Sequence, residues 1–251
     1  SPAVVDGKIY IGSADTRVYC IDARDGEVLW SFQSELAPVT LSSQVYSSPA
    51  VTDGKVYAGS HDGNVYCLNA ENGGLVWKYP TKCYIYSSPA VSDGKVYIAT
   101  HKAPELTGIP YMNTLYCLRA ETEAETGELV WKFQTDGNVM SSPAVVDGKV
   151  YIGSDDEYVY CLNASTGAKL WDYKTGGSVS SSPAIANGKV YVGSMDLNVY
   201  CLRAEDNSKI WSFRTGSGIH SSPAIADGKV HVGSYDGNLY CLNAESGDLL
   251  W

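Results

Sequence analysis

The chain repeats itself six times, and this repetition limits its possible folds more than any other feature. A Ser-Pro-Ala tripeptide recurs along the whole sequence, with its proline at Pro2, Pro49, Pro89, Pro143, Pro183 and Pro223. All six tryptophans follow the same pattern, at Trp30, Trp77, Trp131, Trp171, Trp211 and Trp251. Successive tryptophans are 47, 54, 40, 40 and 40 residues apart, so the unit has 40 residues and two intervals carry insertions. A period of this length indicates a solenoid or a propeller.

Each copy predicts four short strands. In the copy 141–171, a first strand at 141–146 and a second at 149–154 flank Asp147-Gly148, a pair that tolerates the positive φ angles of a type I′ hairpin turn. A third strand follows at 158–164, and a fourth carries Trp171. No segment shows a helical period. We therefore predict an all-β fold, a six-bladed β-propeller of four-stranded antiparallel blades, with a β-solenoid as the structural alternative.

The repeat boundaries define the expected domain organisation. Proline cannot donate a hydrogen bond within a sheet, so the Ser-Pro-Ala strand is expected at the inner edge of its blade. The last copy ends at Trp251, which raises the alternative that the chain is a module of a longer protein. We expect one propeller domain over 1–251, with blades at about 1–33, 47–80, 87–135, 141–175, 181–215 and 221–251.

The segment between the third and fourth strands resembles the tryptophan-docking motif of the pyrroloquinoline-quinone (PQQ)-type propeller repeat family. Its clearest copies are 68–77, 162–171 and 242–251, and the resemblance covers nearly the whole chain. It implies that the six indoles have a structural docking role between adjacent blades. In the fifth copy Asn207 lies where a glycine is expected, and asparagine tolerates the left-handed conformation that the turn needs.

Two functional branches of this family give different expectations. PQQ-dependent quinoprotein dehydrogenases stack the quinone between a tryptophan and a disulfide of adjacent cysteines, with Ca²⁺ beside it. This chain has no adjacent cysteines, and every tryptophan lies at the docking position. The chain is more similar to the non-quinoprotein branch of the outer-membrane β-barrel assembly lipoprotein. That resemblance implies a periplasmic or cell-surface location, with the cytoplasm left open, no cofactor and no catalytic residue. A PQQ-dependent dehydrogenase, with PQQ and Ca²⁺, is the alternative function.

Composition and cysteine spacing exclude other classes. The formal net charge is −10, which is unfavourable for nucleic acid binding, and no apolar stretch is long enough for a membrane span.

The Ser-Ser pairs before five of the prolines are expected to serve packing and hydrogen bonding. Six cysteines recur once per copy and are expected to be buried free thiols. Cys83 lies outside the pattern, either as a reactive or cross-linking thiol or as an ordinary loop residue.

The copies differ most in the connections between the second and third strands and between the fourth strand and the next first strand. In a propeller these connections share one face, and the two large insertions, at about 34–43 and 102–113, both fall there. A short acidic insertion at 121–125 belongs to the opposite face.

The variable positions on the first face are rich in Tyr, His and Met, residue types that are typical of binding surfaces. We predict a non-catalytic scaffold that binds a protein segment or a small ligand there. Tolerated surface variation, and a metal site at His61 and His101, are the alternatives. The candidate residues, which we call the rim, are Tyr46, His61, Tyr84, Tyr86, His101, Tyr111, Met140, Asp155, Met195, His220 and Tyr235.

Overall fold

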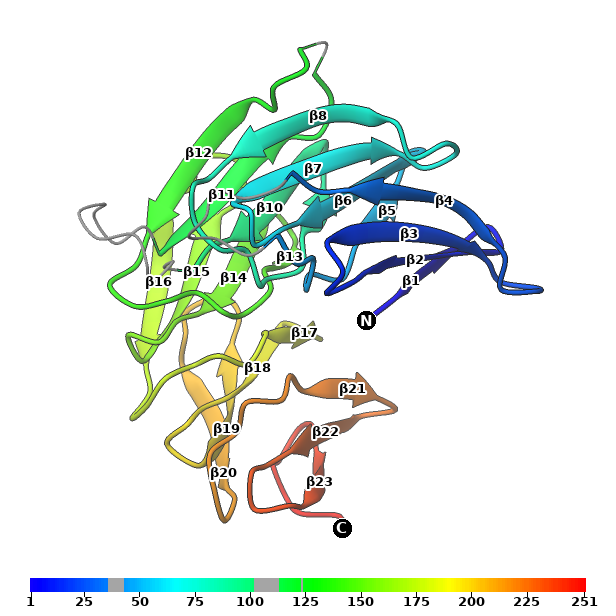
Figure 1. Ribbon diagram of the computed structural model, residues 1–251. Coiled ribbons are helices and arrows are strands. Elements are labelled where there is room, and N and C mark those ends of the chain that lie inside the picture. The colour runs from blue at the N-terminus through cyan, green and yellow to red at the C-terminus, as the bar shows by residue number, and fades with distance from the viewer. Residues whose placement is uncertain (36–42, 102–112, 123) are drawn as a thin grey trace. The chain divides into compact units, whose positions relative to one another are not determined.

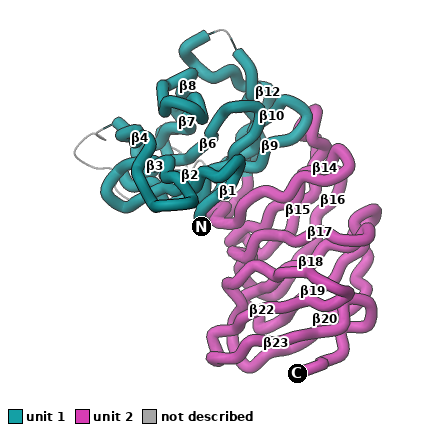
Figure 2. The backbone as a smooth tube through the Cα atoms, turned by 90° about the vertical axis from the view of Figure 1, so that its right-hand side faces the viewer, with its two compact units in different colours: residues 1–134 teal, residues 135–251 magenta. Residues whose placement is uncertain are grey.

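The computed structural model describes residues 1–35, 43–101, 113–122 and 124–251, and these residues form strands and turns (Figure 1). The candidate Tyr111, and most of the two large insertions, lie outside these ranges. Within the described ranges no helix occurs that could cross a membrane. The chain divides into two compact units, Ser1–Gln134 and Thr135–Trp251, which Figure 2 shows in different colours.

The first unit contains three antiparallel sheets of four strands, each ordered as in the sequence. Its strands are β1 (Ala3–Val5), β2 (Lys8–Gly12), β3 (Arg17–Asp22), β4 (Val28–Gln33), β5 (Ala50–Thr52), β6 (Lys55–Gly59), β7 (Asn64–Asn69), β8 (Leu75–Pro80), β9 (Ala90–Ser92), β10 (Lys95–Ala99), β11 (Thr114–Arg119) and β12 (Leu129–Gln134). The short first strands β1, β5 and β9 contact one another in turn, as the inner strands of adjacent propeller blades do.

The second unit contains two four-stranded sheets and one three-stranded sheet. Its strands are β13 (Ala144–Val146), β14 (Lys149–Gly153), β15 (Tyr158–Asn163), β16 (Lys169–Lys174), β17 (Ala184–Ala186), β18 (Lys189–Gly193), β19 (Asn198–Arg203), β20 (Lys209–Arg214), β21 (Ala224–Ala226), β22 (Lys229–Gly233) and β23 (Leu239–Asn243). Here too the first strands β13, β17 and β21 contact one another in order.

These six antiparallel sheets are the blades of a β-propeller, so the predicted all-β propeller fold is confirmed. The prediction of four strands in every blade is wrong for the sixth. Its fourth segment forms an isolated bridge between Leu242 and Leu249 instead of a strand. The reason is the length of this segment. The fourth strand of the fifth blade has six residues, of which Trp211 is the third, and the sixth blade has residues at three of these positions, 249–251.

Turn chemistry follows the sequence closely. In the first hairpin of the second blade, Asp53 and Gly54 have φ angles of 49° and 68°, the positive pair that a type I′ turn requires. The same pair of positive angles recurs in the other five blades. Asn207 has a φ angle of 59°, so asparagine does adopt the left-handed conformation at the position where other copies have glycine.

The paired serines join strands and blades. The hydroxyl group of Ser47 donates to Gly59 O at 2.8 Å and accepts from Gly59 N at 2.9 Å, which ties the inner strand to the second strand of its blade. The second serine of each pair acts between blades, because Ser48 N donates to Ser88 Oγ at 3.0 Å. In the second unit Ser182 N donates to Ser222 Oγ at the same distance. The hydrogen-bonding role expected for these serines is confirmed.

The indoles lie against the following blade. Trp77 Nε1 donates to Ala120 O at 3.2 Å, and Trp211 Nε1 donates to Ala244 O at 3.1 Å. Glycines of the following blades lie close against the Trp77 and Trp211 rings, since an added Cβ atom would come within 2.8 Å of the Trp77 ring at Gly127 and within 2.7 Å of the Trp211 ring at Gly247. Trp30 and Trp171 donate in the same way to Ala70 O and Ala204 O, Trp131 is buried, and Trp251 is 61% exposed.

Candidate functional site

The candidate rim is built on a backbone frame that recurs in both units. In the second to sixth blades, the turn after the second strand is hydrogen-bonded to the connection that enters the same blade. In the first unit His61 N donates to Gln44 O at 2.9 Å, and in the second Met195 N donates to Ser178 O at 2.9 Å. The two kinds of connection therefore share one face within each unit, as the sequence predicted.

In each connection that enters a blade, the variable residue lies between two neighbours whose positions are set by packing or hydrogen bonding. Before Tyr86, the side chain of Ile85 fills the space over Gly59, where an added Cβ atom would lie 2.2 Å from Ile85 Cγ2. After it, Ser87 Oγ donates to Ala99 O at 2.8 Å. Because both neighbours are buried and anchored, the position of Tyr86 is set by the frame and its identity is free to vary.

Five of the candidate residues come together in the first unit. The ring centroid of His61 lies 4.7 Å from that of Tyr46, 4.9 Å from Tyr84 and 4.1 Å from Tyr86. The ring of His101 lies 5.2 Å from Tyr86 and 6.5 Å from Tyr84. Tyr46 and Tyr86 stack with centroids 5.9 Å apart and an interplanar angle of 9°. We call these five residues the aromatic rim cluster.

The cluster has a buried base and an exposed top. His61 is 2% exposed and Tyr84 8%, whereas Tyr46 is 48% and Tyr86 37% exposed. Burial, followed by the charge of nearby His101, lowers the pKa of His61 to about 4. His61 is therefore neutral at neutral pH, and the buried base of the cluster carries no charge at this imidazole.

An Asp–Tyr hydrogen bond beside the rim is a feature that the sequence analysis missed. Tyr66 donates from its hydroxyl group to Asp62 Oδ2 at 2.6 Å, and Asn64 N donates to Asp62 Oδ1 at 2.8 Å. Burial raises the pKa of the Asp62 carboxyl group. The signal was an aspartate four residues before a strand tyrosine, and it also occurs at Asp15, Asp156, Asp196 and Asp236.

In the second unit this aspartate also ties the turn to the preceding connection. Asp196 accepts from Tyr200 at 2.6 Å and from Gly176 N at 2.7 Å. Burial opposes ionisation of Asp196, but these hydrogen bonds outweigh it and lower the pKa. In the first unit, the hydrogen bonds of Asp62 to Tyr66 and to Asn64 N hold the Asp62-Gly63-Asn64 turn together. Among the described residues, no group of three or more His, Cys, Asp or Glu could hold a metal ion.

The remaining candidates do not form a comparable cluster. Asp155 accepts a hydrogen bond from Ser180 at 3.1 Å, and the rings of His220 and Tyr235 lie 6.2 Å apart. Met195 is 38% exposed and Met140 is half-buried. These side chains hold equivalent places on the frame of the second unit and make pairwise contacts in place of a five-ring cluster.

The cysteines are buried free thiols, as expected from their spacing. Burial raises the pKa of Cys67 to about 12 and also raises the pKa of Cys83. A buried thiol with a raised pKa is a poor nucleophile, so the environment of Cys83 disfavours the reactive alternative.

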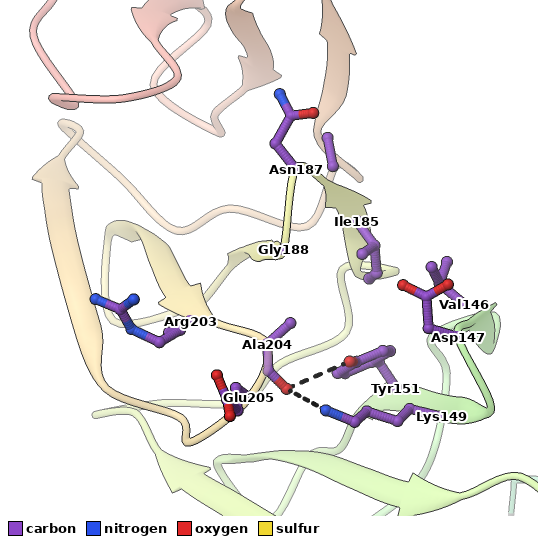
Figure 3. Close-up of a pocket in the computed structure, with 11 residues that line it drawn as sticks. Val146, Asp147, Lys149, Tyr151, Ile185, Asn187, Gly188, Arg203, Ala204 and Glu205 are labelled. Atoms are coloured by element: carbon purple, nitrogen blue, oxygen red, sulfur yellow. Dashed lines mark hydrogen bonds between the residues drawn. The ribbon is translucent and has the colours of Figure 1, made fainter.

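A cleft of about 690 Å³ lies on the opposite face of the second unit, between its first two blades (Figure 3). It is walled by Asp147 of one hairpin turn, by the turn Asn187-Gly188 of the next blade and by 203–205. Lys149 Nζ and the Tyr151 hydroxyl group both donate to Ala204 O, at 3.2 and 3.4 Å, as the dashed lines show. This cleft was not among the predicted sites, and its lining carries charges of both signs.

A protein-family model described as outer membrane protein assembly factor BamB matches residues 14–113, 108–185 and 155–251. The chain belongs to this family. The resemblance stated from the repeats is thus confirmed. A search of curated proteins gives no match.

Solved structures of BamB and of quinoproteins share the fold. BamB from Moraxella catarrhalis has a TM-score of 0.80 at 19% identity, over all of this chain and 71% of that one. A europium-containing methanol dehydrogenase gives 0.78 at 16%, over all of this chain and 68% of that one. The quinohemoprotein alcohol dehydrogenase of Comamonas testosteroni gives 0.80 at 15%, over all of this chain and 60% of that one. At these identities the likeness establishes the fold.

Proposed function

We propose that this chain is a non-catalytic, protein-binding scaffold that takes part in the assembly of outer membrane proteins, and that it works in the periplasm. The family supports both the process and the compartment, because the matching model is described as an outer membrane protein assembly factor. A small ligand on the same face is a second possible occupant, and a protein segment is favoured because the described rim is an exposed surface rather than an enclosed cavity.

The observation that carries the proposal is the aromatic rim cluster. Tyr46 and Tyr86 expose their rings above buried His61, on loops that a rigid sheet holds in place. Aromatic side chains on a preorganised frame provide binding area at a small cost in conformational entropy, and tyrosine is common among the residues that dominate protein interfaces. Loops held on a rigid scaffold are also where binding residues concentrate.

A photo-cross-linking amino acid at position 46 tests this proposal in the native host. The matched control is position 71, because Glu71 is exposed on the opposite face of the same unit. We expect irradiation to give a discrete protein adduct from position 46 and none from position 71. Equal adducts from both positions, or none from position 46 in folded protein, would contradict the proposal.

The quinoprotein alternative requires a cofactor platform that these residues do not provide. The indoles of Trp30, Trp77, Trp171 and Trp211 each donate to an alanine carbonyl oxygen of the following blade and are buried. The cysteines are separate free thiols. Trp251 is 61% exposed, but a stacked quinone also needs a vicinal disulfide opposite the indole, which these separate thiols do not form, so we propose that the chain takes no quinone. Dye-linked oxidation of alcohols or sugars after addition of PQQ and Ca²⁺ should stay at background, and turnover would overturn this part of the proposal.

A further inference from the structure

The most exposed ring of the aromatic rim cluster is that of Tyr46. Its side chain is 48% exposed, and its ring stacks on that of Tyr86 with an interplanar angle of 9°. Because the two phenol rings are nearly parallel, a flat charged group that stacks on the outer face of one ring is also parallel to the other. A positively charged group within about 6 Å of such a face is attracted by the ring quadrupole.

Two imidazole rings hold this pair in place from below. His61 meets Tyr46 at an interplanar angle of 60° and Tyr86 at 68°, and His101 meets Tyr86 at 78°. The two contacts with Tyr86 are edge-to-face, an arrangement that orients aromatic rings. Since the pKa of His61 is lowered, the imidazole beneath Tyr46 carries no charge at neutral pH and does not repel a cation from the rings.

Charge on the rest of the chain favours the same kind of ligand. The formal net charge is −10, and a net negative protein increases the encounter rate with basic partners. The second unit also contains an internal example on this kind of surface. Lys174 Nζ lies over the ring of Tyr158, 5.7 Å from its centroid.

We infer that the stacked pair Tyr46–Tyr86 binds a cationic side chain, arginine or lysine, of the partner protein. The inference rests on the proposed function and specifies the chemistry of the partner segment at the rim. Arginine is the better fit, because its flat guanidinium group stacks on an aromatic face as well as carrying charge. An apolar or aromatic side chain is the competing occupant.

The test compares the capped peptide Gly-Arg-Gly-Arg-Gly with an analogue in which citrulline replaces both arginines. Citrulline keeps the shape of the side chain and removes its charge. Binding is followed by two-dimensional NMR of the full chain with labelled tyrosine. We expect saturable shifts of the Tyr46 and Tyr86 ring signals. The arginine peptide should bind about tenfold more tightly than the citrulline peptide, as estimated from two exposed cation–π contacts.

Variants separate the ring from its hydroxyl group. Tyr46→Phe should keep most of the affinity, and Tyr46→Leu should lose about fivefold, because leucine retains apolar area without a π face. Tyr158→Ala is the control, since Lys174 already covers that ring, and should leave peptide affinity unchanged.

The outcomes distinguish the two proposals. Equal binding of the arginine and citrulline peptides, or an unchanged Tyr46→Leu variant, overturns the cation inference. If the adduct from position 46 is still found, the protein-binding function survives and an apolar contact replaces the charge. If the adduct is also missing, both proposals fail.

Discussion

The rims of the two units share a backbone and differ in their side chains. In both, the turn after the second strand donates a main-chain hydrogen bond to the entering connection, from His61 N to Gln44 O and from Met195 N to Ser178 O, each at 2.9 Å. In the first unit, five rings pack together on this frame and bury an imidazole. In the second, the contacts between corresponding residues are pairwise, such as that of His220 with Tyr235, and Met195 and Tyr235 are exposed.

This difference separates what the repeat fixes from what it leaves free. The serine, glycine and tryptophan contacts are the same in both units, so the frame is stable without any particular rim residue. The first unit uses that freedom to build a continuous aromatic surface. Specialisation of one part of the rim is typical of repeat folds in which function lies on the loops.

The strongest test of the shared frame is to remove one indole from each unit. We expect Trp77→Ala and Trp211→Ala to lower the free energy of unfolding by about 3–5 kcal/mol each, because both leave a large cavity and an unpaired alanine carbonyl oxygen. Urea unfolding monitored by circular dichroism measures the loss. If one substitution costs several times more than the other, the frame is not equivalent in the two units. Trp→Phe at the same positions should cost less and provides a folded comparison.

The buried imidazole should make the first unit sensitive to acid. Unfolded histidine titrates near 6.5, whereas the pKa of His61 in the folded protein is about 4. Between these values the unfolded chain binds a proton that the folded chain does not, so stability falls as the pH decreases from 6.5 to 4. The loss reaches up to about 3 kcal/mol, at about 1.4 kcal/mol per pKa unit.

Urea midpoints at pH 7, 5.5 and 4.5 measure this dependence. The His61→Gln variant should show a shallower decrease than the wild type, whatever its stability at pH 7. His220→Gln, at an exposed position of the second unit, should retain the wild-type slope. An unchanged slope in His61→Gln would mean that His61 is not the group that titrates.

The Asp–Tyr hydrogen bond should matter more where the aspartate is buried. Tyr66→Phe removes a donor at 2.6 Å from Asp62, which is 8% exposed, and should cost about 1.5–3 kcal/mol, the range for hydrogen bonds to charged groups. Tyr240→Phe, beside half-buried Asp236, should cost less. The difference between the two unfolding midpoints is the measurement, and equal losses would show that burial does not set the value of this bond.

Sequence repetition predicted the frame well because its determinants are local. An Asp-Gly pair needs only two positive φ angles to form its turn, and Asn207 could be predicted to tolerate the glycine position for the same reason. The rim positions followed from comparing copies within the chain, since residues that vary on a constant frame lie where the frame does not constrain them.

Contacts between copies were harder to predict. The packing of Tyr46 on His61 and Tyr86 depends on how two connections and a turn approach one another, which a single copy does not encode. Residues 125–127 also pair with Lys78 in the preceding blade, where the sequence suggested a simple acidic loop. The Asp–Tyr spacing was visible in five copies, and it was overlooked because a turn aspartate is sufficiently explained by the turn.

The serine hydroxyl groups have a consequence for association between molecules. An open inner edge of a blade, including the residues that lead into its first strand, would present main-chain N–H groups that can pair with a foreign chain and start aggregation. At Ser48 and Ser182 that N–H group is already occupied by the hydroxyl group of the neighbouring copy. The serine that connects two blades thus also keeps this N–H group from pairing with the backbone of another molecule.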